Sequence, residues 1–379
     1  MPFERRTVME QKTEFVKLAM TGQLSLSQLC RRYNVSRPTG YKWLSRFKEN
    51  GLEGLEELSR RPLYSPHQTS QEIEGRIISF RKENPSWGAK KIYHLLKRDL
   101  GVKPPAKSTI HSILKRNGLI TEQSVKNNKW VRFEYPHPNA LWQMDFKGYF
   151  PMLNQANCHP LTITDDHSRF NIALKACKRQ TREVVETCLI EVFRQYGMPE
   201  MILCDNGTPW GRTSEANDER KVITKLEKWL IRLNIRPIHG RAYHPQTQGK
   251  EERFHRTLKT ELLNYSQISN YDHCQQLFDK WRFKYNHQRP HESLDFKVPM
   301  DRYEPSKRSY PERLPAIEYN SSDVVRKVCD KGHISFKGIE YKVGKALVSE
   351  TVAIRPTTDD GVYSVYFCNQ PIRTINLKL

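Results

Sequence analysis

Residues 141–146 read LWQMDF, a strand-like apolar run interrupted by one carboxylate, Asp145. Residues 201–205 read MILCD, a second such run that ends at Asp205. A third acid, Glu252, lies in the helix-like stretch GKEERFHR. Hard cations such as Mg²⁺ take oxygen ligands and leave room for water and a substrate phosphate. Two strand-end carboxylates and a helical one therefore predict a divalent-metal site for phosphoryl transfer.

The chain is long and strongly basic. Its 379 residues favour more than one domain, and its formal net charge is +21. Residues 1–130 hold 25 Lys and Arg against 12 Asp and Glu, which is +13 of that charge. A concentrated positive field favours a polyanionic partner, and nucleic acid is the commonest one. Composition alone leaves open a ribosomal or merely soluble basic protein.

The cysteines and the lengths of the apolar runs argue against zinc-finger, disulfide-rich, membrane-spanning and secreted proteins. Eight cysteines are scattered without any C-x-x-C pair, which argues against a zinc finger or a disulfide framework and predicts reduced, mostly buried thiols. No apolar run approaches the roughly 20 residues that a membrane span needs. Residues 1–6 lack the apolar core of a signal peptide. We therefore expect a soluble, intracellular protein without a membrane partner.

Residues 1–58 are the first predicted domain, with three short helices. Ser25 and Gln28 fit a capping box, and Ser36 can cap the third helix, in which Pro38 is tolerated in the first turn. A tight turn followed by a polar, basic helix is typical of a helix-turn-helix, whose second helix enters the major groove of DNA. The candidate DNA contacts are Arg37, Thr39, Tyr41, Lys42 and Arg46. The alternative is a small helical bundle without a ligand.

A Gly-, Arg- and Pro-punctuated linker, 51–66, leads to a second helical domain, 67–122. Helices are predicted over three stretches, 72–84, 89–100 and 108–117. Gly118 ends the last of them. This polar last helix again follows a turn, which predicts a second, winged helix-turn-helix and hence a long or bipartite DNA site. Its candidate DNA contacts are Thr109, Lys115 and Arg116.

Residues 136–303 follow a basic linker, 125–139, and show an α/β pattern that begins with antiparallel hairpins. Strands are predicted over 141–150, 158–166, 169–176, 201–205 and 235–239, and helices over 180–196, 218–233, 249–265 and 271–286. A Pro- and charge-rich linker, 304–323, precedes residues 324–379, whose short β-branched runs predict a small all-β barrel. The predicted fold class is multidomain: all-α helix-turn-helix units, a central α/β core and a C-terminal barrel.

Five motifs stand in order in the central region. They are WQMDF (142–146), DDHSR (165–169), CDNG (204–207), HPQTQGKEER (244–253) and YNHQRPHESL (285–294). In this order they resemble the catalytic core of the transposase and retroviral integrase superfamily. The whole layout resembles a bacterial insertion-sequence transposase of the integrase-like type. Retroviral integrases are expected to carry a His/Cys zinc module, and this chain has no such cysteine pair. The resemblance implies an RNase H-like fold over 136–303 with a D, D, E triad.

The resemblance assigns the catalytic and metal-binding roles to Asp145, Asp205 and Glu252, which are separated by 60 and 47 positions. In the family the glutamate falls three residues after a glycine, which selects Glu252, and Glu251 is the competing assignment. The second gap is long for the superfamily, and the stretch Thr208–Val222 fits an insertion. Further basic residues of the same helix are expected to contact DNA phosphates: Lys250, Arg256 and Lys259.

Other acids and histidines in these motifs have competing interpretations. Asp165 and Asp166 follow a predicted strand, and a metal-ligand role competes with a turn in which Asp166 or Ser168 bonds the backbone. The turn is favoured because matching motifs in the family lie outside the triad. Four histidines suggest zinc, but without cysteine partners we expect packing, phosphate contacts or helix-end hydrogen bonds: His244, His255, His287 and His291.

The resemblance implies two Mg²⁺ ions, with Mn²⁺ as a substitute, about 3.5–4 Å apart on the scissile phosphate. One ion activates the attacking oxygen, which is water in cleavage and a DNA 3′-hydroxyl in strand transfer, and the other stabilises the leaving 3′ oxygen. The expected partners are double-stranded DNA, as terminal inverted repeats and target, and further copies of the chain in a homodimer or larger synaptic complex. The expected location is the bacterial cytoplasm, with the nucleoid.

Two other functions stay open at this point. One is a non-catalytic DNA-binding regulator derived from a transposase, against which the intact triad counts. The other is a ribonuclease H-like nuclease without strand transfer, against which the two N-terminal DNA-binding units count.

Overall fold

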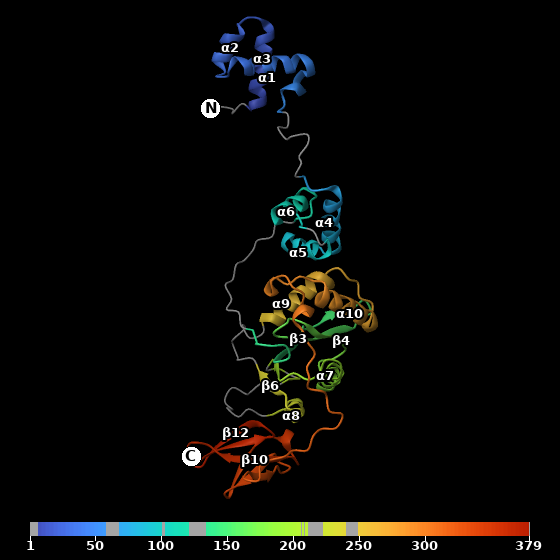
Figure 1. The fold of residues 1–379 in the computed structure, drawn as a ribbon, viewed down its shortest axis with the longest axis vertical. Coiled ribbons are helices and arrows are strands. Elements are labelled where there is room, and N and C mark those ends of the chain that lie inside the picture. The colour runs from blue at the N-terminus through green and yellow to red at the C-terminus, as the bar shows by residue number, and fades with distance from the viewer. Residues whose placement is uncertain are drawn as a thin grey trace. The chain divides into compact units, whose positions relative to one another are not determined.

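The computed structural model describes residues 7–57, 68–100, 103–120, 134–205, 207, 209–210, 223–239 and 249–378. The chain divides into two compact units, Met1–Gln68 and Thr69–Leu379, whose elements are labelled in Figure 1. In the described ranges, no helix is both long and apolar enough to cross a membrane. Residues 58–66 and 125–133 of the two predicted linkers, and most of the predicted insertion Thr208–Val222, lie outside these ranges. The linker prediction is wrong for residues 51–55, which form a 3-10 helix whose Leu55 is buried in the core of the first unit.

The first unit is a three-helix bundle. Its elements are α1 (Val8–Thr21), α2 (Leu26–Arg32), α3 (Arg37–Asn50) and the short 3-10 helix η1 (Gly51–Leu55). Ser25 caps α2 in a capping box and Ser36 caps α3, which confirms both predictions. Phe15 of α1 is fully buried between the helices. Gly40 permits their close approach, because a Cβ there would lie 2.7 Å from the Cys30 sulfur.

The second unit begins with three more helices, each within one residue of its predicted bounds. They are α4 (Gln71–Glu83), α5 (Ala89–Leu100) and α6 (Lys107–Arg116). Their shared core consists of apolar side chains from all three helices: Ile77, Ile92, Leu96, Ile110, Ile113 and Leu114. The described part of 67–122 contains no strand, so the expected wing is not among these residues.

A mixed six-stranded sheet forms the centre and confirms the predicted α/β core. Its strands are β1 (Leu141–Phe146), β2 (Phe150–Pro151), β3 (Asn157–Asp165), β4 (Asn171–Cys177), β5 (Met201–Cys204) and β6 (Arg236–His239). The order is β2-β3-β1-β5-β6, and β4 also pairs with β3. β1 pairs antiparallel with β3 and parallel with β5, so the strand that carries Asp145 lies in the middle of the sheet.

Helices cover both faces of this sheet (Figure 1). They are α7 (Arg182–Tyr196) and α8 (Lys225–Arg232) on one face, and α9 (Gly249–Leu258) and α10 (Tyr271–His287) on the other. Trp142 and Met144 of β1 pack into the core on the α7 side. Side chains alternate along a strand, so Gln143 and Asp145 face the side of α9.

Three elements of the core differ from the predicted bounds by more than two residues, and two of these differences have a local cause. The first predicted strand ends at Phe146, because Gly148 takes a left-handed φ of 89°. The predicted helix 249–265 continues after α9 as a π-helix, η3 (Lys259–Leu263). The Thr257 hydroxyl donates back to a carbonyl one turn earlier, a contact that distorts helices. The predicted helix 218–233 is described only from Lys225 onward, as α8.

The C-terminal region is all-β as predicted, but it is not a closed barrel. Four strands form an antiparallel sheet in the order β12-β11-β10-β7, and β8-β9 is a separate hairpin. The strands are β7 (Val324–Lys327), β8 (His333–Phe336), β9 (Ile339–Lys342), β10 (Thr351–Pro356), β11 (Val362–Phe367) and β12 (Gln370–Asn376). The sheet buries Val352 and Val365 against the hairpin residue Phe336 and Ile231 of α8. Because these elements cover its apolar face, the sheet stays open.

Candidate active site

Strands β1 and β5 are adjacent and parallel, so Asp145 and Asp205 lie together at the C-terminal ends of these two strands. In the pairing of β1 with β5, Gln143 lies opposite Leu203, and the same register continued by two residues sets Asp145 across from Asp205. Neighbouring strands lie about 5 Å apart. Asp145 is half-buried within β1, whereas Asp205 follows the last residue of β5 and is exposed.

Helix α9 brings Glu252 into the electrostatic reach of this pair. Burial raises the pKa of Asp145 to about 7, and the negative charges of Asp205 and Glu252 add to the rise. Neighbouring negative charges favour the protonated form of an acid and so raise its pKa. A bound cation would offset this repulsion. Asp205 and Glu252 are therefore near enough to Asp145 to affect its charge.

The chemistry of these donors suits a hard divalent ion, because all three supply oxygen. Among the described residues, though, no three His, Cys, Asp or Glu side chains stand close enough together to hold one ion. Asp145 and Asp205 are tied to paired strands, whereas Glu252 is exposed on α9. Binding of one ion by all three would therefore require Glu252 to approach the aspartates.

Glu251, the competing third acid, is turned by about 100° around the helix from Glu252 and is buried where Glu252 is exposed. Its side chain is buried, with 1% of the residue exposed, and its Oε2 lies 3.0 Å from Thr162 Oγ1. Burial raises the pKa of Glu251 to about 8. The buried position fits an acid that is protonated at neutral pH, and the exposed position fits one that can meet a solvated ion.

Thr162 explains how a protonated Glu251 is accommodated. Its hydroxyl lies 3.0 Å from the Asp145 carbonyl oxygen and 2.9 Å from His255 Nε2. A hydroxyl has one proton to donate, and the Asp145 carbonyl can only accept it. Thr162 Oγ1 also donates toward Glu251 Oε2, so its one proton is shared between the two acceptors unless a protonated Glu251 donates in return. Thr162, Glu251 and His255 thus form a buried polar cluster directly behind Asp145.

His255 completes this cluster on the Asp145 side. Its Nδ1 lies 3.9 Å from Asp145 Oδ2. Burial lowers the pKa of His255 to about 4, and the charge of Lys147 lowers it further. The imidazole is therefore neutral at pH 7 and does not compensate the carboxylate. His287 also packs within the protein, as expected, because its ring stacks on Phe283. His244 lies outside the described residues.

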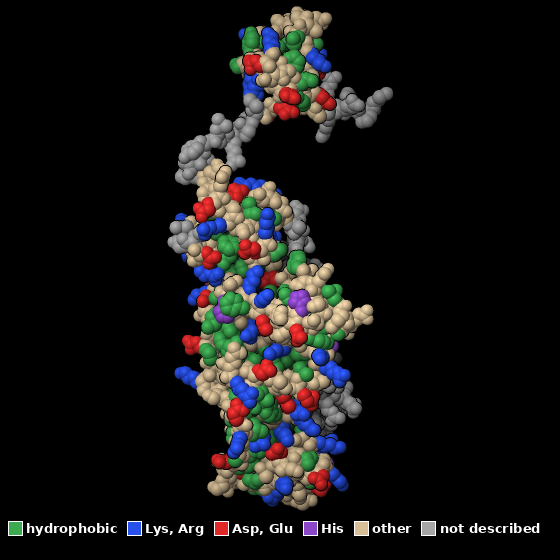
Figure 2. All heavy atoms as spheres, turned by 90° about the vertical axis from the view of Figure 1, so that its right-hand side faces the viewer, with side chains coloured by type: hydrophobic (Ala, Val, Ile, Leu, Met, Phe, Trp, Pro, Cys, Tyr) green, Lys and Arg blue, Asp and Glu red, His purple; other side chains and the backbone are tan. Residues whose placement is uncertain are grey.

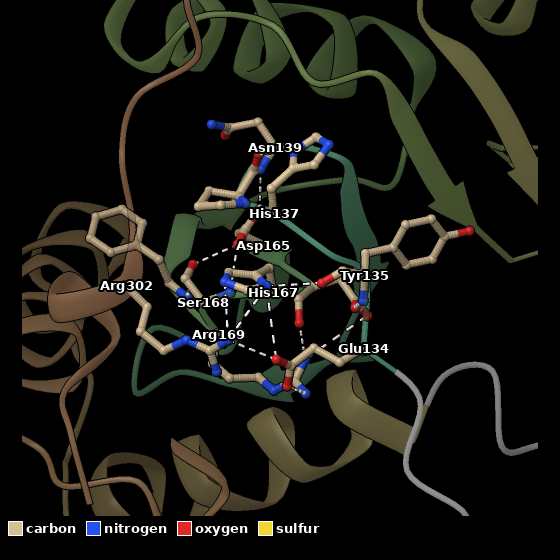
Figure 3. A network of polar contacts seen from close by, with 12 residues as sticks. Glu134, Tyr135, His137, Asn139, Asp165, His167, Ser168, Arg169 and Arg302 are labelled. Carbon is tan, nitrogen blue, oxygen red and sulfur yellow. Dashed lines mark hydrogen bonds and ion pairs between the residues drawn. The ribbon is translucent and has the colours of Figure 1, made fainter. Parts of the chain in front are cut away.

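The Asp165-Asp166 pair forms a turn, as predicted. Asp165 accepts hydrogen bonds from the backbone N–H of Ser168 at 2.7 Å and from that of Asn139 at 2.7 Å. Asp166 accepts from the backbone N–H of Tyr135 at 2.9 Å. Figure 3 shows the part of this network around Asp165, where the side chain points toward Ser168 and Asn139.

The same network extends to elements far apart in the sequence. Glu134 lies between Arg169 and Arg302, which donate to it at 3.3 and 2.7 Å (Figure 3). Lys250, predicted to contact DNA, instead forms an ion pair with Asp166. Burial lowers the pKa of Lys250 to about 8. The turn therefore joins the segment that enters the core, the strand β3 and the helix α9.

The predicted DNA contacts fall into two groups. Most are exposed or partly exposed on α3, α6, α9 and η3: Arg37, Thr39, Tyr41, Lys42, Arg46, Thr109, Lys115, Arg256 and Lys259. Two are engaged within the protein: Lys250 with Asp166, and Arg116 with Glu74 in a two-point ion pair. On the face drawn in Figure 2, Lys and Arg side chains are spread among acidic ones rather than gathered in one stripe.

Two residues near Asp145, Lys147 and Thr162, were not singled out from the sequence, and the place of His255 beside Asp145 was not predicted. Lys147 follows Asp145 by two positions. Burial lowers the pKa of Lys147, and the positive charge of Lys259 lowers it further. Spacing gave a signal only for His255, which lies one helical turn after Glu251. Thr162 comes from β3, and nothing local in the sequence links it to α9.

Comparisons with known proteins agree with this architecture. Residues 136–245 and 233–299 match two models of the integrase core domain. Residues 323–379 match the C-terminal domain of IS481 family transposases. At the other end, residues 11–62 match a helix-turn-helix domain and residues 39–114 a homeodomain-like domain.

Relatives include bacterial and viral proteins. An uncharacterized 31.7 kDa protein of insertion element IS407 from Burkholderia multivorans is 23% identical over 253 residues, which cover 64% of this chain and 86% of that protein. The Gag-Pro-Pol polyprotein of Mason-Pfizer monkey virus is 34% identical over 125 residues, 33% of this chain. The match spans only 6% of that polyprotein's length, as it does for the one of simian retrovirus SRV-1.

Solved structures with weaker likeness are integrases. The catalytic core domain of HTLV-2 integrase in complex with magnesium has 14% sequence identity and a TM-score of 0.33, over 44% of this chain and 97% of that one. The intasome of simian T-cell lymphotropic virus, in complex with the PP2A regulatory subunit B56 gamma, has 16% identity and a TM-score of 0.38, over 80% of this chain and 99% of that one.

The domain matches define the class of protein. In chain order, residues 11–114 match helix-turn-helix and homeodomain-like domains and residues 136–299 match the integrase core domain. The last 57 residues, 323–379, add the C-terminal domain of IS481 family transposases.

Proposed function

We propose that this chain is an active DDE transposase. It binds the terminal inverted repeats of a mobile element, cuts the DNA at the 3′ ends and joins those ends to target DNA. Two observations support this proposal: β1, which carries Asp145, pairs in parallel with β5, which Asp205 follows, and the charges of Asp205 and Glu252 add to the rise that burial causes in the pKa of Asp145. The transposase-type domains on either side of the core support it.

In this proposal the three acids hold divalent ions, Mg²⁺ or Mn²⁺. When bound, such ions supply Lewis-acid activation of the attacking oxygen and neutralise the charge on the leaving 3′ oxygen. Asp145, Asp205 and Glu252 position the ions and form no covalent bond to DNA. Arg256 and Lys259, exposed further along α9 and η3, hold the DNA backbone next to the reacting phosphate.

The helical domains select the DNA. Helix α3 presents Arg37, Tyr41 and Lys42 to solvent, which suits a helix that enters the major groove. Helix α6 presents Lys115 as a second contact. Joining requires both ends of the element to be held together, so we further propose a homodimer or larger synaptic complex, located with the bacterial nucleoid.

Paired substitutions in α9 test the assignment of the third acid. We expect Glu252→Gln to lose cleavage and joining while it keeps specific DNA binding, since binding depends mainly on Lys and Arg. We expect Glu251→Gln, the matched control one residue away, to retain both activities. Joining assays in Mg²⁺ and in Mn²⁺, with DNA that carries the ends flanking the gene, measure this. The reverse pattern would move the third ligand to Glu251.

A further inference from the structure

One buried carboxylate outside the three proposed metal ligands connects the two elements that carry Asp145 and Glu252. Asp166 follows β3, and its side chain has no solvent exposure. Its Oδ1 accepts a hydrogen bond from Gln143 Nε2 at 2.6 Å and forms the ion pair with Lys250. Its Oδ2 accepts from the Tyr135 backbone N–H. Strand β1, helix α9 and the segment entering the core therefore meet at one side chain.

Both side-chain partners of Asp166 precede a proposed metal ligand by two positions. Gln143 precedes Asp145 in β1, and side chains two apart in a strand point to the same face of the sheet. Lys250 precedes Glu252 in α9, and side chains two apart in a helix are turned by about 200°. With Lys250 held against Asp166, Glu252 is directed to the exposed side, as observed. The contact thus sets the rotation of the first turn of α9.

The surroundings show how much of this arrangement depends on Asp166. Gln143 Oε1 has no hydrogen-bond partner among the described residues, so the bond from its Nε2 to Asp166 fixes the amide. Arg169 Nη1 lies 3.9 Å from Asp166 Oδ1. If the Lys250 amine were removed, Asp166 would still have the positive charge of Arg169 nearby. If the Asp166 charge were removed, the two positive charges of Lys250 and Arg169 would face each other without an acid between them. Neutralising Asp166 is therefore the more disruptive change.

We propose that Asp166 is a positioning residue for the metal site: through Gln143 and Lys250 it fixes β1 and the first turn of α9, the two elements that carry Asp145 and Glu252. This inference rests on the proposed function. It gives Lys250 a role inside the protein in place of a phosphate contact. Through the hydrogen bond from the Tyr135 backbone N–H, Asp166 also holds the segment that precedes β1.

Asp166→Asn tests the proposal against a closely matched control, Asp165→Asn. Asp165 is equally buried, but its side chain bonds only to Ser168 and Asn139 among the described contacts. Binding of Mn²⁺ to the full-length chain is measured from the EPR signal of the free ion, and joining is measured against Mg²⁺ concentration. We expect Asp166→Asn to raise both half-saturating concentrations about 10- to 100-fold, as for groups that orient metal ligands. Asp165→Asn should leave both within about threefold of the wild type.

Lys250 supplies a second pair of variants that does not disturb a buried carboxylate. Lys250→Met should raise the metal requirement about tenfold, and Lys250→Arg, which keeps the charge, should restore it. DNA affinity in EDTA should stay unchanged in Asp166→Asn. If Lys250 instead contacts a phosphate, Lys250→Met weakens DNA binding and Asp166→Asn leaves the metal requirement at the wild-type value, which would overturn the proposal.

The failures of the two proposals are distinguishable. Wild-type chain that binds no Mn²⁺ and joins no DNA would overturn the proposed function, and this inference with it. Wild-type metal affinity in both Asp166→Asn and Lys250→Met, alongside joining that is lost in Asp145→Asn, would overturn this inference alone. An equal rise in the metal requirement for Asp165→Asn and Asp166→Asn would also overturn it, because general loosening of the turn would then explain both.

Discussion

Glu251 should make the folded chain less stable as pH rises, and Glu251→Gln should remove that loss. Burial raises the pKa of Glu251 from 4.5 to about 8 in the folded chain. Between these values the folded chain holds a proton that the unfolded chain has released, so the free energy of unfolding falls as pH rises. One pKa unit corresponds to about 1.4 kcal/mol. The full effect is then about 4–5 kcal/mol, present below pH 4.5 and lost by pH 8.

Glutamine reproduces the neutral acid without its titration. Its amide can donate to Thr162 as the protonated Glu251 does, and it is close in size to the glutamic acid. We expect Glu251→Gln to match the wild type near pH 4.5 and to be more stable than the wild type by several kcal/mol at pH 8. The assay is urea denaturation followed by fluorescence at pH 4.5, 6, 7 and 8, in EDTA so that no divalent ion holds the carboxylates.

The neighbouring Glu252 provides the control. Glu252 is exposed, so Glu252→Gln should keep most of the pH dependence of the wild type, including the part that comes from Asp145. The reasoning would be refuted if Glu251→Gln kept the wild-type slope between pH 4.5 and 8. It would also be refuted if the variant were less stable than the wild type by the same amount at every pH, because Glu251 would then be ionised in the folded chain.

Three further substitutions have defined outcomes. Phe278→Ala removes a fully buried ring of α10 that packs on the sheet and should lower the free energy of unfolding by about 3–5 kcal/mol in denaturant titrations. Thr162→Val leaves the Asp145 carbonyl and Glu251 without their shared hydroxyl and should cost about 1–3 kcal/mol in the same experiment. Lys42→Ala removes an exposed charge of α3 and should weaken binding to the element ends, reducing the slope of log affinity against log salt by about 1; an unchanged slope would exclude a phosphate contact.

Local signals in the sequence predicted the helices and most of the strands. Ser25 and Ser36 cap helices because a cap depends only on the next three residues. The β-branched runs of 324–379 do not single out the edge strands β7 and β12. All four residues of β7 are exposed, and β12 contains Pro371, so neither shows the alternation that predicts a strand. Without β7 and β12, the open sheet could not be told from a barrel.

The candidate site was predictable only in part. The sequence places Asp145 within one apolar run and Asp205 at the end of another, but the parallel pairing of the two strands, which brings the two acids together, comes from the structure. The burial of Glu251 does not follow from the sequence, because two adjacent glutamates in a polar helix are both expected to face water. The pairing of Asp166 with Lys250 joins residues 84 positions apart, and each alone fits a solvated charge.

The central claim is that Asp145, Asp205 and Glu252 make this chain a DNA-joining enzyme. The most direct test is a strand-transfer assay with purified protein, Mg²⁺ or Mn²⁺, a labelled duplex carrying the end that flanks its gene, and a plasmid target. We predict joined products with the wild type and none with Asp205→Asn, which should still bind the labelled end. Tight, specific binding by the wild type with no nicking or joining in either metal would contradict the claim and identify a DNA-binding regulator instead.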